Sequence, residues 1–401
     1  MEEVLSAARA VDWSRLGERV LCDACLGRLF GKMGHGHTNE ARGGAVRAAL
    51  GLPEGPCWVC GTLTSRYDAL ADLVVRAMEP WAPDSFLIGS KIDPELAARE
   101  ESLWSDLSVG SPEPLKAEVN REVGKRVEAR GPWTAEFLRP NLVAVVDPAF
   151  DHVDVQVNPL YLRGRYRKLV RGVPQTRWPC TRCRGKGCAR CGGTGKMYAT
   201  SVEEVIAAEV MRETGGSGHA LHGMGREDVD ARMLGRGRPF IVEIKEPRAR
   251  HVDLPSAVRR INASGIAEVD GLEPASGEDV VAIKEDRAAK RYRILVRTSP
   301  PVEEAKLKRT LPVLVAQPIA QRTPERVVHR RADTTRHRRL LAADVARIDG
   351  DLAEIHVTAE AGTYVKEWVH GDGGRTVPSL AERLGVVCEV LELDVLDVLD
   401  G

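Results

Sequence analysis

The cysteine spacing of this chain restricts its fold more than any other feature. Eight of its nine cysteines form Cys-x-x-Cys pairs. In an intracellular chain, such pairs are typical of metal sites rather than of disulfides. The unpaired Cys388 lies in an apolar segment, and we expect it to be a small buried residue. The pairs are Cys22/Cys25, Cys57/Cys60, Cys180/Cys183 and Cys188/Cys191.

The segment Cys180–Cys191 contains two of these pairs and gives the stronger metal signal. Each Cys-x-x-Cys turn presents two thiolates, and two turns together complete a tetrahedral zinc site. Glycines between the pairs allow the backbone to bend, and the surrounding cations offset the negative charge of four thiolates. A redox dithiol is the alternative, but redox chemistry needs one pair and not two adjacent ones.

The other two pairs, Cys22/Cys25 and Cys57/Cys60, have 31 residues between them, which is longer than the commonest zinc-ribbon spacing. The sequence also leaves open that pairs exchange partners between the two sites. With four protein ligands each, both sites would be closed to substrate. We therefore expect one or two structural zinc ions rather than a catalytic metal.

Length and composition predict a soluble protein of two or three domains. The chain has 401 residues, of which 43% are hydrophobic and 29% are charged. It has no apolar run long enough to cross a bilayer, so we expect no membrane partner. The N-terminal segment is charged and amphipathic and does not resemble a signal peptide, which predicts a cytoplasmic protein. For the oligomeric state, a monomer is the default expectation.

Periodicity predicts an α+β fold in the first part of the chain. Apolar residues recur at helical spacing over Arg66–Glu79 and Leu115–Val127, and residues Leu142–Val146 and Val153–Val157 are typical of strands. We expect an N-terminal zinc segment over residues 1–62 and a small α+β domain over residues 63–170.

Strand signals dominate the rest of the chain, so we expect a second α+β domain with a mixed sheet over residues 171–401, into which the four-cysteine module 180–191 is inserted. Ser201 and Glu204 form a capping-box signature that opens a helix, and Gly215 ends it. The predicted strands are PFIVEIKEP, RYRILVRT, LPVLVAQPIAQ and LAEIHVTAEAG.

The net charge of the chain is +0, but its basic residues are clustered. Between Tyr161 and Thr200 there are eleven Lys and Arg residues and no acidic residue, and seven Arg residues lie between Gln321 and Leu340. Such segments are typical of a surface that binds a polyanion. A solvated basic face is the alternative for either segment taken alone.

The segment GREDVDARMLG, residues 225–235, is the candidate catalytic loop. Its charges alternate between glycines, and Arg226 and Arg232 would stabilise an ionised Asp228 as a nucleophile or base. A surface salt-bridge loop is one alternative. A phosphatase-type Asp-x-Asp pair, Asp228 and Asp230, is another, but such a pair normally follows an apolar strand directly, and here the residues HGMGRE come first.

The same segment resembles the catalytic-aspartate motif of the archaeal and eukaryotic tRNA pseudouridine synthases that modify T-loop uridines. The resemblance extends over about residues 155–385 through segments in the expected order. The N-terminal GHGHTNEARG matches moderately, and NREVGKRV followed by two strands is similar to a THUMP-type RNA-binding domain. The matching segments are YLRGRYRKLVRGVPQTRWPC, SVEEVI, KRYRILV, QRTPERVVHRR and GTYVKEWVHGDGGRTVPSLAERLG.

The resemblance implies a fold, a reaction and a set of residue roles. It implies a THUMP-like N-terminal domain, a mixed-sheet catalytic domain, and isomerisation of uridine 54, uridine 55 or both in tRNA without an organic cofactor. Asp228 would be the catalytic aspartate, Tyr292 would stack on the target base, and Lys366 would pair with the aspartate. The other residues expected to bind substrate are Arg226, His329, Arg330, Arg331, Tyr364 and Val365.

Two other function classes remain open from the residues alone. A non-catalytic, zinc-containing tRNA-binding protein or RNA chaperone would use the same basic segments. A THUMP-containing methyltransferase would need a glycine loop for S-adenosylmethionine directly after a strand. The Gly-rich segments here lie among cysteines and inside a basic motif, which disfavours the methyltransferase.

Overall fold

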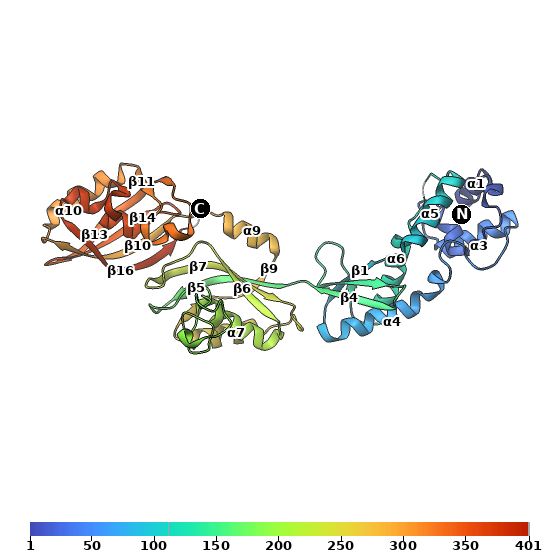
Figure 1. The fold of residues 1–401 in the computed structure, drawn as a ribbon, viewed down its shortest axis with the longest axis horizontal. Helices are drawn as coiled ribbons and strands as arrows, with labels where there is room; N and C mark the ends of the chain where they lie inside the picture. The colour runs from blue at the N-terminus through green and yellow to red at the C-terminus, as the bar shows by residue number, and fades with distance from the viewer. Residues whose placement is uncertain (111, 400–401) are drawn as a thin grey trace. The chain divides into compact units, whose positions relative to one another are not determined.

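The computed structural model describes residues 1–110 and 112–399, apart from the side chain of Arg330. The described residues form two compact units (Figure 1). The first comprises Met1–Asn158 and the short segment Pro247–Arg250, and the second comprises Pro159–Glu246 and the chain from His251 onward. Among the described residues, no helix combines the length and apolar character needed to span a membrane.

The first unit has a helical N-terminal part followed by helices that pack on a small sheet. Its strand order is β2-β1-β3-β4, with β1 parallel to β2 and β3, and β3 antiparallel to β4. Its helices and strands are α1 (Glu2–Arg9), α2 (Asp23–Arg28), α3 (Asn39–Leu50), α4 (Tyr67–Met78), β1 (Ser85–Ser90), α5 (Pro94–Leu107), α6 (Leu115–Glu128), β2 (Thr134–Ala135), β3 (Leu142–Asp147) and β4 (His152–Val157).

Helices α4 and α6 cover the small sheet because their apolar stripes face it (Figure 1). Leu70 and Val74 of α4 and Val119 and Val123 of α6 are fully buried, and removing each from water contributes about 1.5–3 kcal/mol. These helices and strands lie where the sequence predicted them. The α+β prediction for this part of the chain is therefore confirmed.

Close packing of α2 against α3 shapes the N-terminal part of this unit. A Cβ atom at Gly27 would lie 1.8 Å from the carbonyl oxygen of Asn39, and one at Gly43 would lie 1.8 Å from that of Asp23. Only glycine permits this approach at both positions. The contact fixes α2, which begins directly after Cys22 and contains Cys25.

In the second unit, nine described strands form one mixed sheet along the path β13-β14-β10-β16-β7-β5-β8, with β6 paired to β7 and β9 paired to β5. A separate three-stranded sheet has the order β12-β11-β15. The strands are β5 (Leu160–Lys168), β6 (Gly218–Gly223), β7 (Arg232–Lys245), β8 (Ala267–Val269), β9 (Glu273–Ala275), β10 (Lys290–Ser299), β11 (Ile319–Arg322), β12 (Thr335–Arg338), β13 (Leu340–Asp349), β14 (Leu352–Ala359), β15 (Thr376–Val377) and β16 (Val387–Val398).

The helices of this unit pack on the sheet in two groups, and each group has its own buried core. Tyr292 of β10 packs against both cores. The helices are α7 (Val202–Thr214), α8 (Leu254–Asn262), α9 (Gly277–Glu285), α10 (Glu304–Val315), α11 (Val365–His370) and α12 (Leu380–Leu384).

The two halves of the large sheet join through a short parallel contact between β7 and β16. Arg232 and Met233 pair with Asp394 and Val395 there. Gly235 permits the approach, because a Cβ at this position would lie 1.9 Å from the carbonyl oxygen of Leu396. The loop 224–231 ends at this junction, so the candidate catalytic loop lies where the halves meet.

Two sequence expectations differ from the structure. The segment 311–315, predicted as the start of a strand, is the end of helix α10. Leu307, Leu311 and Leu314 recur at helical spacing and are buried, which outweighs the helix-breaking tendency of Pro312. The first unit ends at Asn158, whereas the sequence placed a boundary at residue 170, because β5 pairs with β7 in the second unit.

Candidate active site and metal centres

The candidate catalytic loop connects β6 to β7, and a buried lysine binds its backbone. The Lys168 Nζ donates hydrogen bonds to the carbonyl oxygens of Val173, Asp228 and Val229 at 2.7, 3.0 and 3.2 Å. Lys168 is fully buried, and burial lowers the pKa of its ammonium, although the nearby Glu227 charge opposes this effect. The ammonium therefore fixes the backbone that directly follows the Asp228 Cα.

Glu227 points into the protein and anchors the loop to the sheet. Its carboxylate accepts hydrogen bonds from Tyr166 Oη at 2.9 Å and from Arg238 Nε at 2.8 Å. Arg238 also donates to the Met224 carbonyl at 2.7 Å, and Gln175 donates to the Gly225 carbonyl at 3.0 Å. Because the buried charges are paired, removing one partner is expected to cost about 3–5 kcal/mol.

Asp228 points the opposite way, with its side chain 35% exposed, between Arg326 and Lys366. The Arg326 Nη1 lies 3.4 Å from one carboxylate oxygen and the Lys366 Nζ lies 3.5 Å from the other. Lys366 also contacts Asp230 at 2.7 Å. Burial opposes ionisation of Asp230, but the hydrogen bonds and charge of Lys366 outweigh it and lower the pKa of this carboxyl.

Arg326 bridges Asp228 to a buried carboxylate. Its Nε donates to Glu367 Oε1 at 2.7 Å, and Glu367 is 2% exposed. Burial opposes the guanidinium charge, but Glu367 and Asp228 outweigh burial and raise the pKa of Arg326. The geometry holds a permanent cation beside the Asp228 carboxylate.

The carboxylate faces a cavity of about 820 Å³, a volume typical of sites that enclose a small ligand. Its wall combines Tyr292, Val365 and Tyr364 with several cations. Burial raises the pKa of Tyr292 to about 12, with the Asp228 charge adding to this effect and the Arg238 charge opposing it. The phenol is therefore neutral at physiological pH. Val365 begins helix α11, whose first turn also supplies Lys366 and Glu367.

The residues expected to bind substrate are brought together to different degrees. Arg226 and Arg331 line the cavity, and Arg331 Nη1 donates to Tyr364 Oη at 2.9 Å. His329 is exposed on the 3-10 segment Glu325–Arg330 and is not among the described residues that line the cavity. The Arg330 side chain lies outside the described part of the structure.

Arg232 does not pair with Asp228, contrary to expectation. It pairs with Asp394 at 2.8 Å, because β16 lies directly beside the start of β7. Arg326, which takes the place next to Asp228, was not singled out from the sequence. Its basic segment was recognised, but spacing alone does not indicate which of several arginines points inward.

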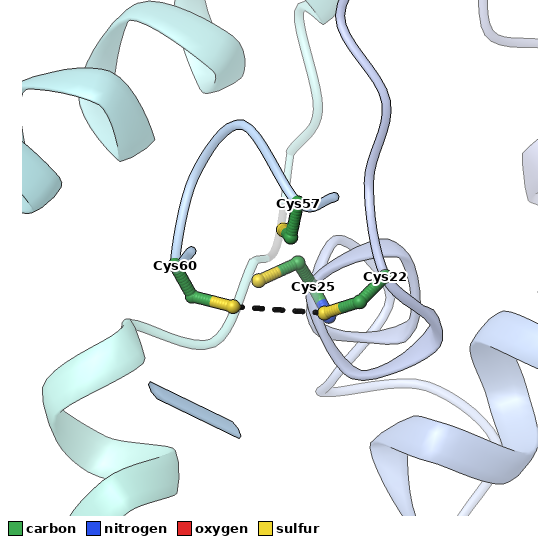
Figure 2. A group of neighbouring side chains, drawn as sticks. All are labelled: Cys22, Cys25, Cys57 and Cys60. Carbon is green, nitrogen blue, oxygen red and sulfur yellow. Dashed lines mark hydrogen bonds between the residues drawn. The ribbon is translucent and has the colours of Figure 1, made fainter. Parts of the chain in front are cut away.

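Among the described residues, two cysteine clusters have the arrangement of metal ligands: Cys22/Cys25/Cys57/Cys60 and Cys180/Cys183/Cys188/Cys191. The four sulfur atoms of each cluster lie within 4.8 Å of one another. Figure 2 shows the first cluster, with Cys22 and Cys60 Sγ atoms 3.7 Å apart. The cysteine pairs therefore do not exchange partners between sites.

The sulfur separations fit a tetrahedral thiolate metal. Zn–S bonds of 2.3 Å in a tetrahedron place the sulfurs about 3.8 Å apart. In the second cluster, the Cys180–Cys188 and Cys183–Cys191 separations are 3.9 Å and the Cys188–Cys191 separation is 3.7 Å. A disulfide needs about 2.05 Å. The donor set therefore fits Zn²⁺ in both clusters.

Backbone and side-chain donors around the sulfurs stabilise thiolate charge. Cys191 Sγ accepts backbone N–H groups of Cys188 and Gly195, each at 3.2 Å. In the first cluster, the buried Arg28 donates to Cys25 Sγ at 3.2 Å and pairs with Glu100. Donors of this kind orient ligands around structural metals.

The unpaired Cys388 lies outside both clusters and is 3% exposed, as expected. The histidine in VHGDGGRT makes a local contact. His370 Nδ1 accepts the backbone N–H of Asp372 at 3.1 Å, a local hydrogen bond.

Comparison with known proteins shows related sequences over almost the whole chain. The family model described as "Pus10, C-terminal" matches residues 161–399, and the model described as "Pus10 THUMP domain, archaeal" matches residues 70–147. The THUMP-like prediction for the first unit is thereby confirmed.

Curated relatives carry one name, "tRNA pseudouridine synthase Pus10". The relative from Methanothrix thermoacetophila is 41% identical over 97% of this chain and 93% of its own length. The relative from Methanopyrus kandleri is 41% identical over 94% and 95%, and that from Pyrococcus furiosus is 38% identical over 99% and 98%.

Proposed function

The chain belongs to the Pus10 family of tRNA pseudouridine synthases, and from this premise we propose that it isomerises uridine 54, uridine 55 or both in the T loop of tRNA, with Asp228 as the catalytic residue. One observation carries the proposal. Asp228 lines the cavity with a partly exposed carboxylate held between Arg326 and Lys366, whereas the neighbouring Glu227 carboxylate is fully buried and paired with Arg238.

The reaction needs a group that acts at the ribose. The N1–C1′ bond of uridine breaks, the uracil turns, and C5 bonds to C1′. The proton on C5 leaves and N1 gains one, so atoms and charge balance without a redox partner. Asp228 acts either as nucleophile at C1′ or as base at C2′, and the carboxylate position is compatible with both.

The cavity wall suits a detached base. The target must leave its stack to reach Asp228. Tyr292 would stack on the uracil, and Val365 would close the apolar side of the cavity while the base turns. Lys366 and Arg326 would stabilise the negative charge of the Asp228 carboxylate, which either role requires.

The remaining predicted residues would hold the RNA around the target. Arg226, Arg331 and Tyr364 line the cavity, and His329 and Arg330 belong to the basic segment Gln321–Leu340. The THUMP domain and the basic segment Tyr161–Thr200 would contact phosphates and set the position of the tRNA.

Zinc is the metal we propose for both cysteine clusters, in a structural role. Four protein sulfurs surround each site, so the metal has no open position for substrate. When bound, it would crosslink the segments that carry the cysteines. Cys22/Cys25 and Cys57/Cys60 would tie α2 to the loop before α4, and Cys180–Cys191 would close the inserted module.

Carbodiimide mapping of pseudouridine in tRNA transcripts tests the proposal. We would compare wild type with Asp228→Ala on unmodified tRNA and on transcripts carrying U54C or U55C. Wild type is expected to produce pseudouridine in the T loop, the two altered transcripts identify which position reacts, and Asp228→Ala is expected to bind tRNA without product.

The mapping also separates the enzyme from a non-catalytic tRNA-binding protein or RNA chaperone. If wild-type protein with intact fold and bound zinc binds tRNA and forms no pseudouridine, the enzyme proposal is wrong. Activity retained by Asp228→Ala would instead contradict the assignment of the catalytic residue alone.

A further inference from the structure

Trp178 is an aromatic residue of the cavity that the reaction described above does not use. It is half-buried and lines the same cavity as Asp228 and Arg226. The Arg226 guanidinium lies over its ring, 4.9 Å from the centroid. Its edge contacts Tyr198, with centroids 5.5 Å apart and planes at 80°.

Trp178 lies where the chain enters the four-cysteine module. The Trp178 carbonyl accepts the N–H of Met197 at 3.0 Å, and the N–H of Cys180 donates to the Gly195 carbonyl at 2.7 Å. These two hydrogen bonds form a short antiparallel ladder where the chain enters and leaves the module. Tyr198 lies in the segment that follows the module. Both aromatic rings of the contact therefore lie where the chain enters and leaves the module.

The chain just before Trp178 is anchored to the catalytic loop. Gln175 donates to the Gly225 carbonyl at 3.0 Å and to Tyr166 Oη at 2.8 Å, and the N–H of Arg177 donates to Glu203 at 3.1 Å. Trp178 thus lies between the catalytic loop on one side and the first metal ligand, Cys180, on the other. A metal bound to Cys180 would limit the movement of Trp178 on the side of the module.

An aromatic ring at this position matches the chemistry of an unstacked RNA loop. Every nucleobase has an aromatic face, and stacking on a protein ring contributes about 1–3 kcal/mol per base. When the target uridine leaves its stack, its neighbours lose a stacking partner. The Arg226 guanidinium, a flat cation, covers the ring in the RNA-free protein and occupies the space that a base would take.

We propose that Trp178 is a stacking platform for the nucleobase next to the target uridine, and that the Cys180–Cys191 metal module holds it in place. The proposal rests on the proposed function, because it takes the T loop as the substrate. It assigns the second metal site a part in substrate binding. Trp178 contacts RNA and not the reacting atoms, so it affects binding more than the chemical step.

Fluorescence of 2-aminopurine tests the proposal without turnover. The base would be placed in turn at each T-loop position beside the target in a full-length tRNA. Binding would be measured with the full chain in an Asp228→Asn background. Stacking on an indole quenches 2-aminopurine, so we expect one position at which binding lowers emission. Trp178→Leu should restore the emission and raise Kd about 5- to 150-fold.

Companion variants keep the test independent of a folding defect. Trp178→Phe, which retains a smaller ring, should quench partially and bind with intermediate affinity. Cys183→Ser with Cys188→Ser should lose the quenching while far-ultraviolet circular dichroism stays unchanged. Trp81 is the matched control, because Arg248 lies over its ring at 4.9 Å in the first unit, and Trp81→Leu should leave the quenching intact.

Equal emission from the Trp178→Leu, Trp178→Phe and parent complexes at every position would overturn the stacking proposal. Loss of quenching in Trp178→Leu with full quenching in the metal-site variant would overturn the part assigned to the module. Absence of pseudouridine formation by wild type would contradict the proposed function instead, because the fluorescence measurement does not depend on catalysis.

Discussion

At the residue scale, the site depends on two adjacent carboxylates that point in opposite directions. Glu227 is buried with Arg238 and Tyr166, while Asp228 faces the cavity between Arg326 and Lys366. The buried carboxylate fixes the backbone, and the partly exposed one is the proposed catalytic group. This division explains how an acidic loop residue acquires a defined direction.

Arg326→Ala is predicted to slow the chemical step. It removes the charge-assisted contact to Asp228 and leaves Glu367 buried without its partner, and a contact of this kind is worth about 1.5–3 kcal/mol. The single-turnover rate of pseudouridine formation should fall about 10- to 100-fold. Arg326→Lys should recover part of the rate.

Lys308→Ala is the control for this change, because Lys308 pairs only with Glu304 among the contacts described for it, on the surface of α10. Its rate should equal that of wild type. A full rate in Arg326→Ala would show that the guanidinium does not assist Asp228.

Much of the site could be read from the sequence, because the family resemblance places Asp228, Tyr292, Val365 and Lys366 in order. The structure brings these residues together around one cavity. Arg326 could not be selected, since a run of arginines on an irregular segment has no periodicity that indicates direction. Pairing of Arg232 with Asp394 was equally invisible, because it depends on a contact between strands 162 positions apart.

At the scale of elements, the contact between β7 and β16 holds the two halves of the second unit together at the candidate catalytic loop. The strands pair over few residues, and side chains reinforce them. Asp394 is fully buried and pairs with Arg232 and Arg171 at 2.8 Å and with Arg293 at 3.2 Å. Its charge therefore links the loop after β5 with β7 and β10.

Asp394→Asn is predicted to destabilise the second unit in a pH-dependent way. Burial opposes ionisation of Asp394, but hydrogen bonds from Arg232 and the Arg171 charge outweigh it and lower its pKa below the ordinary 3.8. A lowered pKa contributes stability that is full above the unfolded value and is lost as pH falls through the folded value.

Urea unfolding of Asp394→Asn and wild type from pH 7 to pH 3 measures this effect. The free energy of unfolding should be lower in the variant by about 2–3 kcal/mol at pH 5–7, and the difference should shrink below about pH 4. Asp349→Asn, an exposed pair with Arg347, should change stability by less than about 0.5 kcal/mol. A difference that stays constant down to pH 3 would contradict the ion-pair interpretation.

Metal removal is predicted to act on the first unit through its own cluster. Cys57→Ser removes one ligand of the first site, so zinc measured by mass spectrometry should fall from about two ions per chain to about one. The first unit should then unfold at a lower temperature, because the site ties the start of α2 to the loop before α4. Its ligands Cys22 and Cys57 are 35 positions apart in the sequence.

Cys388→Ala provides the control for the metal measurement, since Cys388 is buried outside both clusters. It should retain the zinc content of wild type. Unchanged zinc content in Cys57→Ser would mean that this cluster does not hold the metal.

Elements were predicted well where one periodicity was clear. Helices α4 and α6 and the strands β3 and β4 lie at the expected positions, and Ser201 caps α7 through the N–H of Glu204. The run LPVLV was wrongly predicted to be a strand, because a short apolar run with valines resembles one. Burial of Leu307, Leu311 and Leu314 decides for a helix, and that packing is not visible locally.

At the scale of the whole molecule, zero net charge coexists with strongly basic segments. Tyr161–Thr200 contains no acidic residue and Gln321–Leu340 contains only Glu325 and Asp333, so the total charge hides the surface expected to contact RNA. The four-cysteine module adds exposed cations, Arg182, Lys186 and Arg190, next to the cavity residue Trp178.

Binding of tRNA is predicted to weaken steeply with salt in spite of the neutral total. A slope of log K against log salt of about −4 to −6 would correspond to release of counterions by about five to seven phosphate contacts. Replacing Arg182, Lys186 and Arg190 together with Ala should make the slope less steep by about two to three. Lys308→Ala should leave the slope unchanged, and so would the triple variant if the module does not contact phosphates.

The most direct test of the central claim is release of tritium from tRNA labelled at uridine C5, because pseudouridine formation replaces that hydrogen with the bond to C1′. Wild type and Asp349→Asn should release tritium in step with pseudouridine. Asp228→Asn should release none above background while it binds tRNA with unchanged Kd. Release by Asp228→Asn at the wild-type rate would contradict Asp228 as the catalytic residue and would place the chemistry elsewhere in the molecule.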